Sequence, residues 1–146
     1  MPLFVFNFHP SINLYIISFF SQGFSYAYVK PEKAKIEIVV NDDWPGIKGF
    51  KKVNTVLQYD ENYKSVTAWG AKALAGEPPK KNKGNKALPK PVELFKLHLG
   101  KIPDSKKPKL PNEVPPERAI TDYLREMGNY LCFFWGTDYH NIHLRP

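Results

Sequence analysis

The clearest pattern along the chain is an alternation of large and small or polar side chains, which is typical of β-strands. Four runs show this spacing or are short apolar runs between turn residues: residues 23–28, 35–40, 54–59 and 65–69. Because alternation places every second side chain on one face, it also predicts which residues share a face. We therefore predict a four-stranded antiparallel meander over residues 23–69, with Ile36, Ile38 and Val40 on its buried side.

Apolar residues three and four positions apart predict helices later in the chain. The strongest segment is PERAITDYLREMGNYL, residues 116–131, where Pro116 suits the first helical position. The stripe expected to be buried consists of Ala119, Ile120, Tyr123, Leu124, Met127 and Leu131. The residues expected to lie away from it are Arg118, Asp122, Arg125 and Glu126. Two shorter segments, AKALAG at residues 71–76 and VELFKLHLG at residues 92–100, predict brief helical turns that end at glycine.

Positive charge is concentrated in one proline-rich segment. Residues 77–109 hold ten lysines against three acidic residues, which accounts for the whole net charge of +7. Four prolines in residues 78–91 predict little regular structure and high mobility there. The segment is either a solvated loop or a surface that contacts acidic partners. It contains no arginine, and Phe95 is its one aromatic residue, so we expect no specific nucleic-acid binding.

The apolar N-terminal segment, residues 1–22, does not fit a targeting signal or a spanning helix. No basic residue precedes Lys30, although a secretory signal begins with a basic region. Polar residues and Pro10 interrupt the run, whereas a spanning helix needs about 20 mostly apolar residues. We expect a buried or partly ordered strand, with a membrane-tethered segment as the alternative. The single cysteine, Cys132, lies in an apolar run, which predicts a small buried side chain and a reducing, cytoplasmic location.

The order of these elements resembles the start of an actin-like ATPase domain. The family that it resembles is the seventy-kilodalton heat-shock chaperones, in a divergent branch abundant in some fungi. The stretches that carry the resemblance are GFSYAY, EIVVNDDWPGIKGFKKVNTVLQYDENYKSVTAWGAKALA, KPVELFKLHLGKIPD and ERAITDYLREMG, within residues 23–128. The resemblance implies an α/β protein: a partial first lobe of the ribonuclease-H-like ATPase fold, with an antiparallel sheet, an insertion at 77–91 and a C-terminal helix. Residues 1–22 and 129–146 lie outside the family pattern, which suggests a truncated or misjoined gene product.

The family's first hairpin begins with Asp-x-Gly-Thr-Thr, which holds the phosphates of ATP and organises Mg²⁺. An ungapped count back from residues 20–21 places Tyr15 at the aspartate, Ile17 at the glycine, and Ser18 and Phe19 at the threonines. A β-branched isoleucine cannot follow the backbone of that glycine without strain. Ser18 alone keeps a hydroxyl, so it is the one cofactor-binding residue that the resemblance leaves in this loop. The family's cofactors are ATP and Mg²⁺, and we expect this chain alone to bind neither, or nucleotide only weakly.

A second family motif, apolar-x-x-x-Lys-x-x-x-Gly, matches residues 92–100 and places Lys96 at the lysine. In the family this lysine orients the attacking water or stabilises the γ-phosphate, which makes Lys96 the candidate catalytic residue. The alternative is that Lys96 faces water like the other lysines of the basic segment.

We therefore predict a fragment of a chaperone-like ATP-binding protein, without ATPase activity of its own, that binds an unfolded polypeptide or a partner polypeptide. The alternative is a small basic module that contacts acidic partners through residues 77–109. His140 and His143 are spaced to share a metal ion, but two ligands do not make a stable site, so no metal site is expected.

Overall fold

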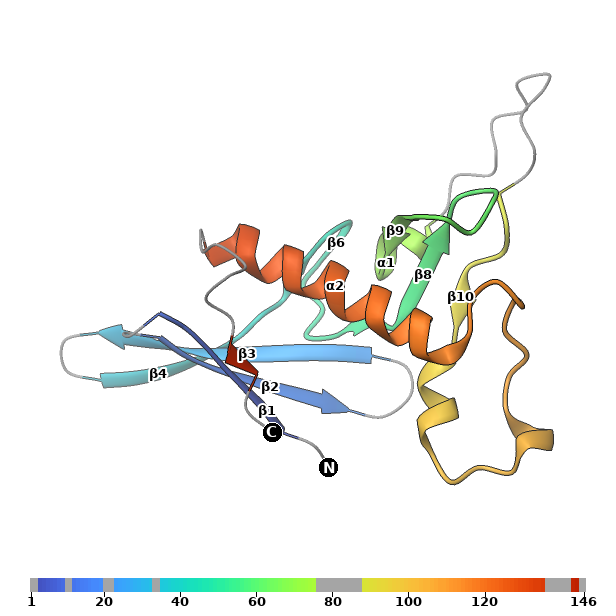
Figure 1. The fold of residues 1–146 in the computed structure, drawn as a ribbon. Helices are drawn as coiled ribbons and strands as arrows, with labels where there is room; N and C mark the ends of the chain where they lie inside the picture. Colours follow the sequence, from blue (N-terminus) through green and yellow to red (C-terminus); the bar gives the residue numbers. More distant parts are fainter. Residues whose placement is uncertain are drawn as a thin grey trace, which may run out of the picture. The chain divides into compact units, whose positions relative to one another are not determined.

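The computed structural model describes residues 3–9, 12–19, 23–32, 35–75, 88–135 and 143–144. These residues form a mixed α/β structure of small antiparallel sheets and one long helix (Figure 1). The α/β class and the antiparallel pairing predicted from the sequence are therefore confirmed. The chain divides into a first unit, residues 1–54 and 127–146, and a second unit, residues 55–126.

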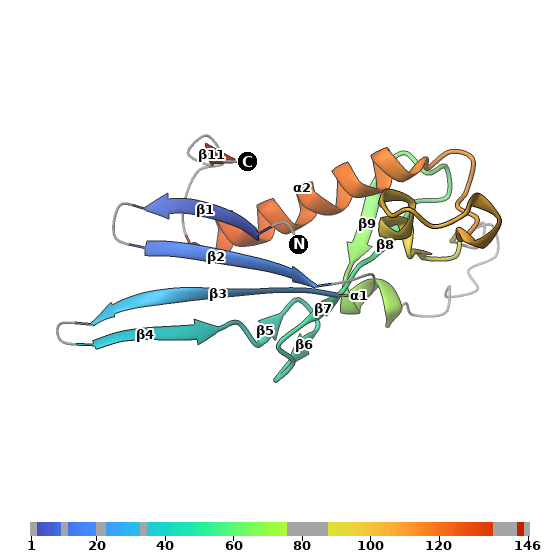
Figure 2. The same ribbon diagram turned by 90° about the horizontal axis from the view of Figure 1, so that it is seen from below.

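The first unit is built on an antiparallel sheet with the strand order β11-β1-β2-β3-β4, in which β7 also pairs with β3 (Figure 2). Its strands are β1 (Leu3–His9), β2 (Ile12–Phe19), β3 (Gly23–Glu32), β4 (Lys35–Val40), β7 (Val53–Asn54) and β11 (His143–Leu144). A separate short hairpin joins β5 (Asp43–Trp44) to β6 (Ile47–Lys48). The predicted pairing of β3 with β4 is confirmed, and the apolar N-terminal residues form the strands β1 and β2, as the strand interpretation predicted.

The predicted burial of β4 is wrong. Ile38 is 68% exposed and Val40 is 40% exposed, while Ile36 lies among the residues whose side chains the structure does not describe. Register explains the difference, because Val40 pairs with Ala27 and therefore shares its face. The other face of β3 carries Phe24 and Tyr26, which are almost fully buried and pack against the ring of Trp44, at centroid distances of 5.6 and 5.4 Å.

The second unit contains its own three-stranded antiparallel sheet, in the order β10-β8-β9. Its strands are β8 (Val56–Tyr59), β9 (Val66–Trp69) and β10 (Val92–Glu93). The predicted pairing of β8 with β9 is confirmed, but the single meander over residues 23–69 is wrong. Strand β7 turns back onto the start of β3, and the chain then enters a different sheet at β8. All four side chains of β8 are buried, so this strand is covered on both faces.

The predicted helices are present. Helix α2 (Pro116–Trp135) begins at Pro116 as predicted and continues four residues beyond the predicted end. Helix α1 (Ala71–Leu74) and the 3₁₀ turn η1 (Phe95–Leu99) match the two shorter predictions, and η1 ends at Gly100. A second 3₁₀ turn, η2 (Asp104–Lys106), follows in the proline-rich region.

Three smaller expectations can be compared with the described residues. Residues 88–91 have no regular structure, whereas residues 78–87 of the predicted irregular segment lie outside the described part of the chain. Cys132 is buried, as its apolar neighbours predicted. Within the described residues, no helix combines the length and the apolar character that crossing a bilayer requires.

Candidate functional site

Lys96 lies in the 3₁₀ turn η1, directly after the strand β10. Leu94 adopts a left-handed backbone conformation with φ of 58°, which turns the chain sharply before η1. Phe95 then enters the core of the second unit with no exposed surface, and Leu97 N–H donates a hydrogen bond of 2.9 Å to the Leu94 carbonyl. The turn is therefore fixed on both sides of Lys96, and the direction in which this side chain leaves the backbone is set by packing.

The ammonium group of Lys96 rests on an aromatic ring. Its Nζ lies 5.4 Å from the centroid of the Tyr123 ring, in the range of a cation–π contact. Tyr123 is almost fully buried and is itself held by Phe95 and by an edge contact with Trp69, at centroid distances of 5.9 and 5.8 Å. A rigid aromatic platform thus carries the amine.

The electrostatic setting of Lys96 differs from that of its basic neighbours. Lys101, Lys106 and Lys109 are exposed, whereas Lys96 is half-buried. Within the described part of the chain Lys96 has no carboxylate partner. Burial lowers the pKa of Lys96, because removing water disfavours the charged form. This amine is therefore a partly dehydrated cation whose electrostatic partner is a ring face, an arrangement that suits contact with an added oxyanion.

Helix α2, which carries Tyr123, also carries a buried polar residue that the sequence analysis did not predict, Asp122. Asp122 is 7% exposed, although it was predicted to lie away from the buried stripe. Its carboxylate accepts a hydrogen bond of 2.9 Å from the Tyr59 hydroxyl, and it pairs with Arg125 at 2.6 Å and Arg118 at 3.4 Å. Burial, and then the bond to Asp122, raise the pKa of Tyr59. The cluster ties strand β8 to helix α2, so its role is to hold the frame that carries Tyr123.

The residues aligned with the family's phosphate loop belong to the first unit. Residues 15–19 run within strand β2, where Ser18 pairs with Phe24 of the neighbouring strand. An extended ladder directs its backbone N–H groups to adjacent strands rather than toward one bound anion. Ser18 belongs to the first unit and Lys96 to the second.

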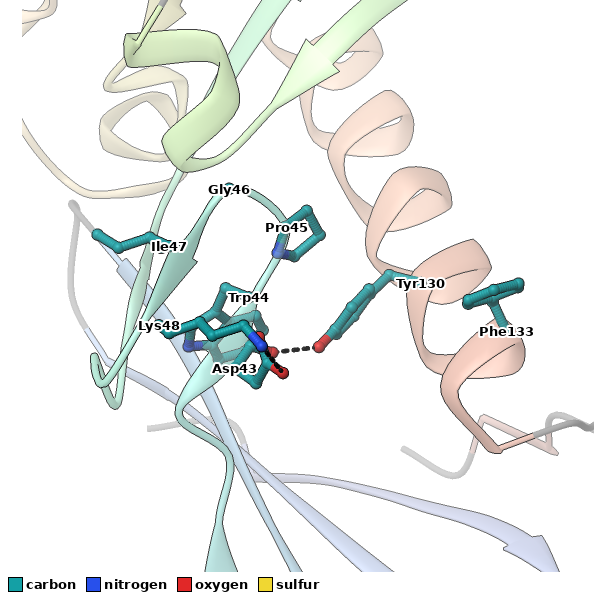
Figure 3. A pocket seen from close by; sticks show the side chains of 8 residues that line it. All are labelled: Asp43, Trp44, Pro45, Gly46, Ile47, Lys48, Tyr130 and Phe133. Carbon is teal, nitrogen blue, oxygen red and sulfur yellow. Dashed lines mark hydrogen bonds and ion pairs between the residues drawn. The ribbon is translucent and has the colours of Figure 1, made fainter.

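The first unit contains a cleft of about 540 Å³. Figure 3 shows the side chains that line it. It lies between the β5–β6 hairpin and the second half of α2, with Trp44, Tyr130 and Phe133 among its lining residues. The Tyr130 hydroxyl donates to the main-chain carbonyl of Asp43, and the indole N–H of Trp44 donates to the Phe50 carbonyl at 2.7 Å. Trp44 is buried, and these contacts are structural.

The remaining candidates from the sequence add no chemistry to these sites. His140 lies outside the described residues, and His143 is in the short strand β11. Among the residues that the structure describes, there is no group of three or more potential metal ligands.

Comparison of the chain with protein-family models, with curated proteins and with solved structures finds no match.

Proposed function

We propose that this chain is part of a chaperone-like ATP-binding protein, that Lys96 contacts a phosphate group, and that the chain alone does not hydrolyse ATP. The sequence resemblance over residues 23–128 supports the assignment to the actin-like ATPases of the heat-shock chaperone type. The match of residues 92–100 to the family's lysine motif supports the role of Lys96.

One observation carries the proposal: Lys96 is a half-buried cation with an aromatic platform and, among the described residues, no carboxylate partner. A lysine whose only task is solubility gains most from full hydration. Burial without an anion disfavours its charge, and an added phosphate oxygen would relieve that cost. The turn η1 and the ring of Tyr123 hold the amine in place before any ligand arrives, which reduces the entropy lost on binding.

The residues missing from the phosphate-loop positions argue against hydrolysis by the chain alone. Phosphoryl transfer needs several charge-stabilising groups around one site, including a metal ion and a positioned water molecule. Positions 15–19 lack the aspartate, glycine and threonines that supply part of this set in the family. A lone lysine–phosphate contact in water, at a separation of ~4 Å, is worth only about 1 kcal/mol. We therefore expect weak nucleotide binding and no turnover.

The test is a titration of isotope-labelled protein with Mg·ATP, followed by amide chemical shifts, together with a phosphate-release assay. The expected result is weak binding that shifts signals in residues 94–100 and of Tyr123, with no phosphate release. Lys96→Ala should abolish these shifts. Lys106→Ala is the matched control, because Lys106 carries the same charge in the same segment but is exposed. Equal shifts in all three proteins, or none in the wild type, would disprove a specific phosphate contact at Lys96.

A further inference from the structure

The second unit contains a cleft of about 500 Å³ that the proposed nucleotide contact does not use. We call it the second-unit cleft. Its walls are Tyr63, residues 90–94 and residues 108–111. Residues 90–94 include the short strand β10, which is the end strand of its sheet within the described part of the chain. Two extended, proline-containing stretches and one tyrosine thus enclose the space.

Each wall of the second-unit cleft is held by a side chain that contacts a main-chain carbonyl. The three pairs are Gln58 with Pro89 at 2.8 Å, His98 with Pro108 at 2.9 Å, and Arg118 with Tyr63. All three contacts are partly buried, which reduces the competition from water. The cleft therefore exists before a ligand arrives, and binding there does not require the walls to be ordered first.

The rim of the second-unit cleft is basic. Lys90 stands on one wall and Lys109 on the other, and both are exposed. Neither has a carboxylate partner among the described residues. Glu93 is the one acidic residue of the lining. Among residues 88–109, which the structure describes, six lysines stand against two acidic residues, and this excess of positive charge attracts anionic partners.

The interior of the second-unit cleft is apolar. Leu94 and Leu110 are half-buried beside the proline rings and Tyr63. A free phosphate or a small dianion would leave this apolar surface unused. A nucleic acid is disfavoured because the lining has no arginine and Tyr63 as its one aromatic ring. The lining matches a ligand that carries both carboxylates and an aliphatic side chain.

We propose that the second-unit cleft binds a short, extended acidic peptide segment. An aliphatic side chain of that segment packs between the two proline-containing walls, and flanking carboxylates pair with Lys90 and Lys109. Because β10 is the end strand of its sheet within the described residues, an extended peptide would form main-chain hydrogen bonds along its outer edge. This inference does not depend on the proposed nucleotide contact, because Lys96 is not part of the lining.

The test uses the whole chain and a fluorescein-labelled peptide with a central leucine between runs of glutamate, read by fluorescence anisotropy. Lys90→Ser with Lys109→Ser should weaken binding about tenfold, because two exposed ion pairs are lost. The matched control is Lys101→Ser with Lys106→Ser, which makes the same change in charge at exposed positions outside the cleft and should weaken binding less than about threefold. A peptide with glutamine in place of glutamate should bind much more weakly.

Three outcomes would overturn the proposal. Equal weakening by the two double variants would show diffuse attraction to the basic segment. Equal binding of a peptide with serine in place of the central leucine would show that the apolar interior is not used. A single-stranded oligonucleotide of the same charge that binds as tightly, with the same dependence on Lys90 and Lys109, would identify a general polyanion surface. Lys96→Ala should leave peptide binding unchanged, so failure here is distinguishable from failure of the nucleotide proposal.

Discussion

Replacement of Asp122 by alanine should destabilise the protein by about 1.5–4 kcal/mol. The buried Tyr59 hydroxyl would lose its acceptor at 2.9 Å, and an unsatisfied buried hydroxyl costs about 1–3 kcal/mol. The ion pairs add less, because the side chains of Arg118 and Arg125 are 34% and 55% exposed and solvent screens them. Together the two pairs contribute roughly 0.5–1 kcal/mol. The predicted loss is a large fraction of a typical stability of about 5–15 kcal/mol.

Urea unfolding followed by circular dichroism measures this loss. Asp122→Asn keeps a carbonyl oxygen that accepts from the Tyr59 hydroxyl, so this variant should lose only the ion-pair contribution. Its urea midpoint should therefore lie between those of the wild type and Asp122→Ala. Asp104→Ala is the control, since Asp104 forms an ion pair with Lys107 at 2.8 Å but its side chain is 94% exposed. The control should leave the urea midpoint unchanged. If Asp122→Ala behaves like Asp104→Ala, the cluster does not hold β8 to α2 and the reasoning fails.

Three further predictions concern the ionisation of buried tyrosines, the buried and exposed faces of β3 and β4, and the effect of Lys96 on stability. Burial raises the pKa of Tyr59 and of Tyr123. The free energy of unfolding should therefore be retained below about pH 10, the ordinary tyrosine pKa, and fall as the pH rises above it. Tyr59→Phe should make this alkaline fall in stability shallower, and an unchanged slope would contradict the reasoning. Ile38→Thr should change the free energy of unfolding by less than about 0.5 kcal/mol, whereas Tyr26→Ala should cost about 3–5 kcal/mol, and urea midpoints in the reverse order would refute the assigned faces. Lys96→Met should leave the free energy of unfolding equal or raise it, because the change removes a charge whose hydration is reduced by burial. A decrease in that free energy of more than about 1 kcal/mol would indicate that Lys96 stabilises the fold.

Helix α2 shows what the sequence alone predicts and where it stops. The position of Pro116 and the spacing of apolar residues predict the helix and the burial of Ala119, Tyr123, Met127 and Leu131, because both are local properties. Leu124, from the predicted stripe, is 51% exposed, while Asp122 is buried. Buried Asp122 accepts a hydrogen bond from Tyr59, which lies 63 positions earlier in the chain. No local sequence pattern predicts such a contact.

The strands show the same division between local and non-local information. Alternation identifies which residues of β4 share a face, but it does not say which face the rest of the chain covers. That depends on Trp44, whose ring packs on the face of Phe24 and Tyr26. Strand β8 shows no alternation because both of its faces are buried, and its Gln58 is accommodated by donating to the carbonyls of Tyr59 and Pro89. The lysine motif locates Lys96, but the platform beneath it is a tertiary contact with Tyr123.

The most direct test of the phosphate contact is the pKa of the Lys96 amine, measured by the ¹³Cε shift in an NMR titration with and without ATP. In the free protein Lys96 should titrate below the ordinary lysine value, because burial lowers its pKa. A phosphate oxygen at the amine favours the charged form, so ATP should raise the pKa of Lys96. A pKa of Lys96 that ATP does not raise would contradict the assignment of Lys96 as the phosphate-contacting residue.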